Sequence, residues 1–262
     1  MNRPLILVTN DDGIAAPGIQ NLIKVAQQLG EVVVVAPDSP QSGMGHAITI
    51  ADPLRLKPVD IYPGIVAYEC SGTPVDCVKL AKNVLLKDRQ IDLCVSGINH
   101  GSNAAINIIY SGTLSAAMEA SLEKIPSIGF SLLDYAHNAN FGASLPYIKS
   151  IMEYVLENGI EEGSLLNVNI PDLPYEELKG MKVCRQADAR WVEEFLEAKD
   201  PRGQPYYWLT GKFVNDEPNK DDTDVWALDN GYISVVPSMH DLTNYRAVKE
   251  MKRMESLAVT NM

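Results

Sequence analysis

The sequence lacks the features of a membrane-spanning or secreted protein. Its longest uninterrupted apolar stretches, Leu5–Val8 and Val32–Ala36, fall far short of the roughly 20 residues that a transmembrane helix needs. The first four residues lead directly into the first of these stretches, without the apolar segment and small-residue cleavage site of a secretory signal. We therefore expect a cytoplasmic protein with no membrane partner.

Cysteine is scarce, and its spacing does not indicate a zinc site or a disulfide framework. The four cysteines form no CxxC pair and lie in apolar runs, at Cys70, Cys77, Cys94 and Cys184. Such a placement is typical of buried, reduced thiols.

Positive charge is in deficit, since 22 Lys and Arg stand against 34 Asp and Glu, a formal net charge of −12. Binding to a DNA or RNA backbone relies on Lys and Arg that displace counterions, so a nucleic-acid polymer is not an expected partner. A small phosphorylated substrate is compatible with this charge if a cation and aligned backbone N–H groups offset the repulsion locally.

What the sequence does have is an alternation of β-rich apolar runs with helical patterns over its first half. The patterns predict strands at 5–9, 32–36, 91–96 and 127–130, and helices at 19–29, 75–86 and 114–122. This alternation is typical of βαβ units and hence of an α/β fold with a mostly parallel sheet flanked by helices. The 262 residues fit a single domain over 1–262.

The second half of the sequence shows a different pattern of predicted elements. The patterns predict a helix from about Tyr147 to Glu157, a strand at 165–170, β-ribbon at Tyr206–Phe213 and Val225–Val236, and a terminal amphipathic helix at Leu242–Leu257. Asp229-Asn230-Gly231 is a favourable tight-turn sequence for the second ribbon. We expect residues 185–262 to form a β-ribbon and helix extension for oligomerisation, including arms exchanged between subunits.

The first polar loop, Asn10-Asp11-Asp12-Gly13, directly follows the first predicted strand. Open α/β sheets place their ligands in the loops at the carboxyl ends of their strands. A single Asp before a helix is most often a cap, but two in succession indicate a site for a hard divalent cation, which prefers oxygen ligands.

The second loop, residues 36–46, follows the second predicted strand and contains Ser42. Its glycines do not form a dinucleotide fingerprint, because Ile48 stands where the third glycine belongs, and no Gly-Lys-Ser or Gly-Lys-Thr indicates a P-loop. A serine such as Ser42, taken alone, is more often a turn hydroxyl than a ligand. It becomes a candidate ligand only if the first two strands are neighbours.

The third loop runs from Ser96 to Asn103 and continues to a helix that opens with Ser111-Gly112-Thr113. The first N–H groups of a helix are unpaired and carry partial positive charge, so this start suits a phosphate. The alternative, that Ser111 or Thr113 only caps the helix, remains open. A serine-hydrolase elbow is excluded, because Cys94 stands where its first glycine should be.

Several of these stretches resemble the SurE (survival protein E) 5'-nucleotidase family. They are VTNDDGIAAPGI at 8–19, GTPVDCV at 72–78, VSGINHGSN at 95–103, YSGT at 110–113 and DNGYIS at 229–234. The order of the motifs matches throughout, so the resemblance covers most of the chain. The sequence departs from the family at Ala105, Ser115 and Ala120, where the family usually has glycine.

The resemblance implies a Rossmann-like fold, one divalent cation per subunit (Mg²⁺ or Mn²⁺), and assembly into homodimers or homotetramers. It also implies hydrolysis of nucleoside 5'- or 3'-monophosphates, with short polyphosphate as a side activity. Carried over by motif, Asp11, Asp12, Ser42 and Asn99 are the metal ligands, with Asp11 and Asp12 also catalytic, and Asn103, Ser111, Gly112 and Thr113 bind phosphate.

Two other classes of protein place acidic residues after a first strand. A haloacid-dehalogenase-type phosphatase needs a nucleophilic Asp at the first position of its loop, where this sequence has Asn10, a poor nucleophile. A receiver-like signalling module needs a phospho-accepting Asp at the end of a later strand, whereas Asp92 lies at a strand's start. Both remain as alternatives of lower weight.

Overall fold

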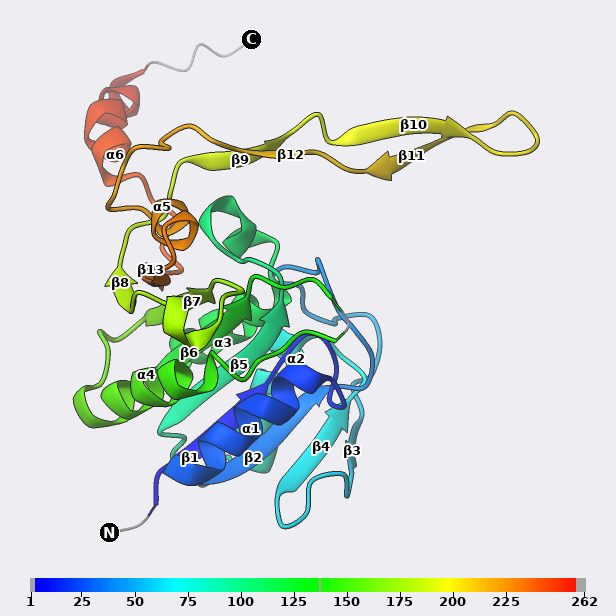
Figure 1. Cartoon of the computed structure of the whole chain (residues 1–262), viewed down its shortest axis with the longest axis vertical. Coiled ribbons are helices and arrows are strands. Elements are labelled where there is room, and N and C mark those ends of the chain that lie inside the picture. The colour runs from blue at the N-terminus through cyan, green and yellow to red at the C-terminus, as the bar shows by residue number, and fades with distance from the viewer. Residues whose placement is uncertain (1–2, 137, 258–262) are drawn as a thin grey trace.

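The computed structural model describes residues 3–136 and 138–257. Met1 and Asn2, which precede the first expected strand, and the last residues of the domain expected over 1–262 lie outside the described residues. The centre of the molecule is a nine-stranded, mostly parallel sheet with the order β3-β4-β2-β1-β5-β6-β7-β13-β8 (Figure 1). The predicted α/β fold is confirmed.

Six parallel strands make up the body of the sheet: β4 (Val66–Cys70), β2 (Glu31–Pro37), β1 (Leu5–Thr9), β5 (Leu93–His100), β6 (Ser127–Leu132) and β7 (Ser164–Ile170). At one edge, β3 (Leu56–Pro58) runs antiparallel to β4. At the other, β13 (Ile233–Met239) runs antiparallel to β7 and is followed by β8 (Met181–Val183). The strand expected at 91–96 begins later and runs to His100, so Asn99 belongs to its end.

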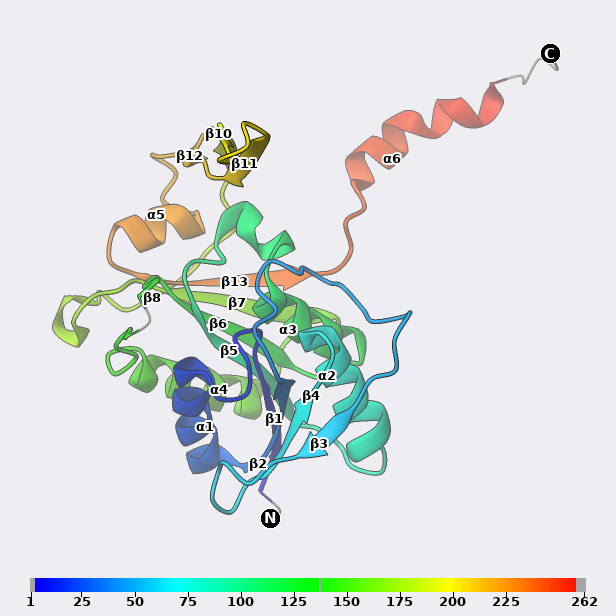
Figure 2. The ribbon, with the colours of Figure 1, turned by 90° about the vertical axis from the view of Figure 1, so that its right-hand side faces the viewer.

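Helices cover both faces of the sheet (Figure 2). The helices are α1 (Pro17–Leu29) and α4 (Leu145–Asn158) on one face, and α2 (Pro74–Leu80), its π-helical continuation η1 (Ala81–Leu85) and α3 (Gly112–Leu122) on the other. In β1, Ile6 and Val8 pack toward the first pair while Leu5 and Leu7 pack toward the second. Each of these side chains contributes about 1.5–3 kcal/mol by burial.

The β-ribbon expected at Val225–Val236 is wrong in its first half. Residues 224–229 form the short helix α5 (Asp224–Asp229), capped by Thr223, whose Oγ1 accepts from the Trp226 N–H at 3.3 Å. The Asn-Gly pair ends this helix, with Gly231 at φ +79°, instead of closing a hairpin. The same tolerance of positive φ serves helix ends and tight turns, so the local pattern did not distinguish them.

The remaining C-terminal segments project from the sheet. A long antiparallel arm, which includes the β structure predicted at Tyr206–Phe213, extends to one side (Figure 1). It consists of β9 (Ala189–Val192) with β12 (Lys212–Asn215), and β10 (Phe195–Lys199) with β11 (Pro205–Leu209). Within the predicted terminal helix, α6 (Tyr245–Met251) is followed by the 3-10 turn η4 (Lys252–Ser256). No helix among the described residues is long and apolar enough to cross a membrane.

Candidate active site

The three predicted loops meet at the carboxyl edge of the sheet. Strand β1 lies between β2 and β5, with Val8 opposite Val34 and Thr9 opposite Ser96. The loops that follow these strands converge on one cavity of about 850 Å³. Six of the predicted site residues line it, namely Asp11, Asp12, Ser42, Asn99, Asn103 and Ser111.

Asp11 and Asp12 stand where β1 ends. Asp11 is buried, and its Oδ1 accepts a hydrogen bond from Oγ1 of Thr113. Burial raises the pKa of Asp11 to about 6; the bond from Thr113 lowers it, and the charge of Asp12 adds to the rise. Burial likewise raises the pKa of Asp12, opposed by the charge and backbone of His100. Two adjacent carboxylates in this environment need a nearby positive charge if both are to be ionised.

Asp12 has an oxygen that the protein leaves unused. Its Oδ2 is buried and has no hydrogen-bond partner within the described part of the chain. Leaving a buried acceptor unsatisfied costs about 1–3 kcal/mol, more for a charged group. An oxygen of this kind fits a ligand to a hard cation.

Asn99 and Ser42 bring neutral oxygens to the same cavity. The Nδ2 of Asn99 donates to the carbonyls of His100 at 3.1 Å and Gly101 at 2.9 Å, which fixes the amide and leaves its Oδ1 for a ligand. Ser42 is exposed in its loop, which the Gln41 N–H ties to the Asp11 carbonyl at 2.7 Å. Two carboxylates and two neutral oxygens form a hard donor set that fits Mg²⁺ or Mn²⁺.

The start of α3 shows the helix cap that was one of the two alternatives, and the phosphate site stays a prediction. Ser111 is the helix cap, its Oγ accepting from the Leu114 N–H at 3.1 Å, and it also lines the cavity. Gly112 and Thr113 are buried in the first turn. A Cβ on Gly112 would lie 2.7 Å from the Cβ of Asp11, so only glycine allows the helix to approach the aspartate so closely.

Asn103 is held by a buried polar network that the sequence analysis missed. Its Nδ2 donates to the Ser131 Oγ at 2.9 Å, its N–H donates to the Asn169 Oδ1 at 2.8 Å, and its carbonyl accepts from the Asn167 Nδ2 at 2.9 Å. The Nδ2 of Asn169 donates in turn to the Asn167 Oδ1 at 2.8 Å. The sequence did contain a sign of this network, because two Asn residues alternate with apolar residues in the buried strand segment LLNVNI.

The arm closes one side of the cavity, which the sequence analysis did not predict either. Residues of β9, β11 and the segments that join the strands line the cavity, namely Arg190, Trp191, Glu194, Leu209, Thr210 and Gly211. Nothing in the spacing of these residues connects them to the acidic loop, because they lie far along the chain.

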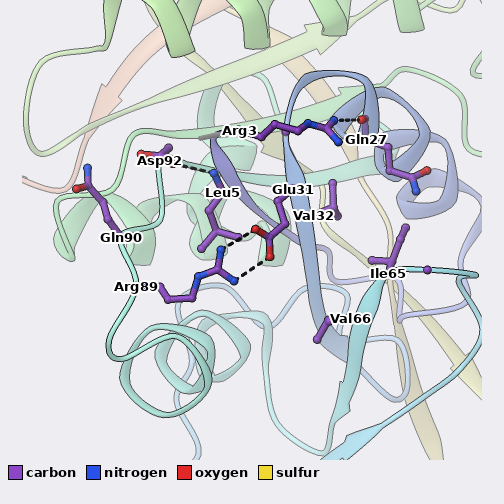
Figure 3. Close-up of a pocket in the computed structure, with 12 residues that line it drawn as sticks. Arg3, Leu5, Gln27, Glu31, Val32, Ile65, Val66, Arg89, Gln90 and Asp92 are labelled. Atoms are coloured by element: carbon purple, nitrogen blue, oxygen red, sulfur yellow. Dashed lines mark hydrogen bonds and ion pairs between the residues drawn. The ribbon is translucent and has the colours of Figure 1, made fainter. Parts of the chain in front are cut away.

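A second cavity of about 790 Å³ lies at the opposite edge of the sheet, near the starts of β1 and β2 (Figure 3). Its charged groups are hydrogen-bonded to each other or to the backbone. Arg89 forms a bidentate pair with Glu31 at 2.8 and 2.7 Å, and Asp92 accepts from the Leu5 N–H at 2.7 Å (Figure 3). None of the predicted site residues lines this cavity. The carboxyl edge is therefore the candidate active site.

The fold and the cavity define an α/β protein with an acidic, oxygen-rich site at the carboxyl edge of a parallel sheet. Residues 6–193 match the family model described as survival protein SurE. The chain is 59% identical to the 5'-nucleotidase SurE of Cytophaga hutchinsonii, covering 97% of both chains. It is 47% identical to the 5'-nucleotidase SurE of Bacteroides fragilis, covering 97% of this chain and 98% of the relative.

The crystal structure of the SurE protein from Aquifex aeolicus has the same fold, with a TM-score of 0.84 and 43% identity, covering 96% of this chain and 100% of that one. The chain belongs to the SurE family, as its motifs predicted.

Proposed function

We propose that this chain is a metal-dependent phosphomonoester hydrolase that releases phosphate from nucleoside 5'-monophosphates. Its curated SurE relatives are named 5'-nucleotidase. The observation that carries the proposal is the buried, unpartnered Oδ2 of Asp12 beside the buried Asp11. The proposal extends to nucleoside 3'-monophosphates and, as a side activity, to short polyphosphate, in line with the sequence resemblance.

The donor set supports one divalent cation per subunit, Mg²⁺ or Mn²⁺, held by Asp11, Asp12, Ser42 and Asn99. When bound, such a cation neutralises charge on the phosphate and on the two aspartates. The described residues contain no group of three or more His, Cys, Asp or Glu side chains that could hold a metal, so neutral oxygens must complete the site.

The protein's own groups bind and orient the phosphate. The N–H groups of Gly112 and Thr113 lie in the first turn of α3, where partial positive charge favours an anion. Asn103, fixed by Ser131, adds a side-chain contact. The carboxylate of Asp12 accepts a proton from the water that attacks phosphorus. As the bond to the nucleoside oxygen breaks, that proton passes to this oxygen, so the nucleoside leaves as an alcohol and phosphate remains.

The test is phosphate release from a panel of nucleoside monophosphates with Mg²⁺, with Mn²⁺ and with chelator. We expect metal-dependent release that falls by about 100-fold or more in Asp11→Asn, because a charged group at the reacting centre is lost. Asp38→Asn is the matched control, an exposed acid after β2 that does not line the cavity. Full turnover in Asp11→Asn would overturn the proposal.

The same assay separates the proposal from a haloacid-dehalogenase-type mechanism. In the proposed mechanism water attacks directly, so acid quenching during turnover traps no phosphoenzyme. The position of a covalent nucleophile is held by Asn10, whose Nδ2 donates to the Gly13 carbonyl at 2.9 Å. A trapped aspartyl-phosphate would favour the covalent alternative.

We further propose that residues 185–262 act as an oligomerisation extension with subunit-exchange arms, giving a homodimer or homotetramer. The ribbon formed by β10 and β11 exposes a set of apolar side chains, Phe195, Leu196, Tyr206, Tyr207, Trp208 and Leu209. Soluble monomers rarely expose contiguous apolar surface of this kind. Light scattering should give the mass of a dimer or tetramer for the wild type and a lower mass for Trp208→Glu; a monomeric wild type would contradict the proposal.

We also propose a cytoplasmic location. All four cysteines are free and buried, which suits a reducing compartment. Fractionation of cells that produce the tagged protein should recover it with cytoplasmic markers, and recovery with periplasmic or membrane markers would contradict this.

A further inference from the structure

The cavity continues beyond the acidic end to aromatic side chains that the proposed mechanism does not use. Tyr110 precedes the cap of α3, Tyr135 follows β6, and Trp191 comes from β9 of the arm. All three line the cavity. A volume of about 850 Å³ lies in the upper part of the range for cavities that enclose whole small molecules, so the cavity exceeds the needs of a phosphate group alone.

Trp191 is held in place at the edges of its ring. Its Nε1 donates to the Asn107 Oδ1 at 2.8 Å, and the Asn107 Nδ2 donates in turn to the Ser102 carbonyl at 3.3 Å. Its ring meets Phe213 edge-to-face, with centroids 5.5 Å apart. Strand β9 packs against η2 (Ala105–Ile109), where the arm leaves the body of the molecule (Figure 1). Even so, 38% of Trp191 remains exposed.

The charges at this end of the cavity do not suit a second phosphate. Arg190 is the one Arg or Lys among the described residues that line the cavity, and its guanidinium is paired with Asp216. Glu194 adds a negative charge nearby. A fixed aromatic ring without a free cation favours a flat, neutral group instead.

From these contacts we propose that Trp191 is the stacking surface for the nucleobase. The inference rests on the proposed nucleotidase function and adds that the base, not only the phosphate and sugar, is bound. Every base offers a π-face, so stacking on Trp191 predicts that purine and pyrimidine monophosphates are both accepted.

The experiment compares AMP with ribose 5-phosphate, which carries the same sugar and phosphate without the base. Trp191→Ala is expected to lower kcat/KM for AMP on the order of tenfold or more, as loss of one stacked base predicts, while changing that for ribose 5-phosphate little. Trp191→Phe, which keeps an aromatic face, should recover much of the AMP rate. Tyr154→Ala is the control, an exposed aromatic residue on α4 that does not line the cavity.

An equal loss on both substrates in Trp191→Ala would mean that Trp191 only supports the structure, and would overturn the inference. An unchanged kcat/KM for AMP in Trp191→Ala would overturn it as well. Either result leaves the nucleotidase proposal intact as long as the wild type hydrolyses AMP; a wild type that hydrolyses no nucleotide would instead overturn the proposed function.

Discussion

Glu119 on α3 and His46 in the loop after β2 form a pair, with the Nε2 of His46 2.9 Å from the Oε2 of Glu119. The Nζ of Lys79 lies 2.5 Å from the other carboxylate oxygen. The side chain of Glu119 is 4% exposed. A buried carboxylate on the helix that starts at the cavity therefore holds the loop that carries Ser42.

Glu119→Gln should loosen this loop. We expect the free energy of unfolding to fall by about 1–3 kcal/mol, because His46 and Lys79 lose a charged acceptor. The Mg²⁺ concentration for half-maximal activity should rise about tenfold or more, since residues that orient ligands commonly have effects of this size. Glu123→Gln, at the end of the same helix, is the control. An unchanged Mg²⁺ requirement would show that Ser42 does not depend on the pair.

The same carboxylate predicts a loss of stability in acid. Burial by itself raises the pKa of Glu119, but the hydrogen bonds and charges of His46 and Lys79 outweigh it and hold the pKa below its ordinary value of 4.5. Ionised Glu119 thus stabilises the folded state above pH 4.5, and this contribution disappears as the pH falls below that value. In urea unfolding between pH 7 and 3, wild type should lose stability more steeply than Glu119→Gln in this lower range; parallel curves would contradict the assignment.

Thr113 tests how the helix supports the acidic pair. Its hydroxyl donates to the Oδ1 of Asp11, and the side chain is fully buried. Thr113→Val keeps the shape but removes the donor, so kcat should fall about tenfold. Thr113→Ser keeps the donor and should stay close to wild type. If both variants behave alike in steady-state kinetics, packing rather than the hydrogen bond is what matters.

The acidic loop could be predicted because its residues directly follow a buried strand, and local pattern is enough to locate that position. Asp11, Ser42 and Asn99 end or follow β1, β2 and β5, and a parallel sheet brings those ends together. Most strands and helices were predicted for the same reason. The helix α5 was not predicted, because six residues are too few to show a helical pattern of apolar residues. Tertiary contacts hold it instead: Asp224 accepts hydrogen bonds from the Ala105 and Ala187 N–H groups, at 2.8 and 2.9 Å.

The contacts that hold the site residues in place could not be predicted from the sequence for another reason. Glu119 meets His46 across 73 positions, and Thr113 meets Asp11 across 102. A single sequence carries no signal that joins residues so far apart, and the arm that brings Trp191 to the cavity is a case of the same kind.

Metal binding should be visible without turnover. A ligand at a hundred times its Kd stabilises a protein by about 2.7 kcal/mol, which corresponds to a rise in Tm of roughly 5–10 °C for a chain of this size. We expect saturating Mg²⁺ to raise the Tm of wild type and of Asp38→Asn by this amount, but that of Asp12→Asn far less. An equal shift in Asp12→Asn, measured by calorimetry, would place the cation elsewhere.

Ala105 has the backbone of a glycine, with φ at +51°. This left-handed conformation costs an ordinary residue about 1–2 kcal/mol. Ala105→Gly would remove that strain but lose a buried methyl group, worth about 0.8 kcal/mol, and add about 0.5–1 kcal/mol of backbone entropy to the unfolded chain. The terms nearly cancel, so the free energy of unfolding should change by less than about 1 kcal/mol in either direction.

The same substitution in a right-handed helix has no strain to relieve. Ala116→Gly in α3, where the side chain is also fully buried, should therefore lower the free energy of unfolding by about 1.5–2 kcal/mol. Denaturant unfolding of the two variants measures the difference directly. Equal losses would mean that Ala105 is not strained.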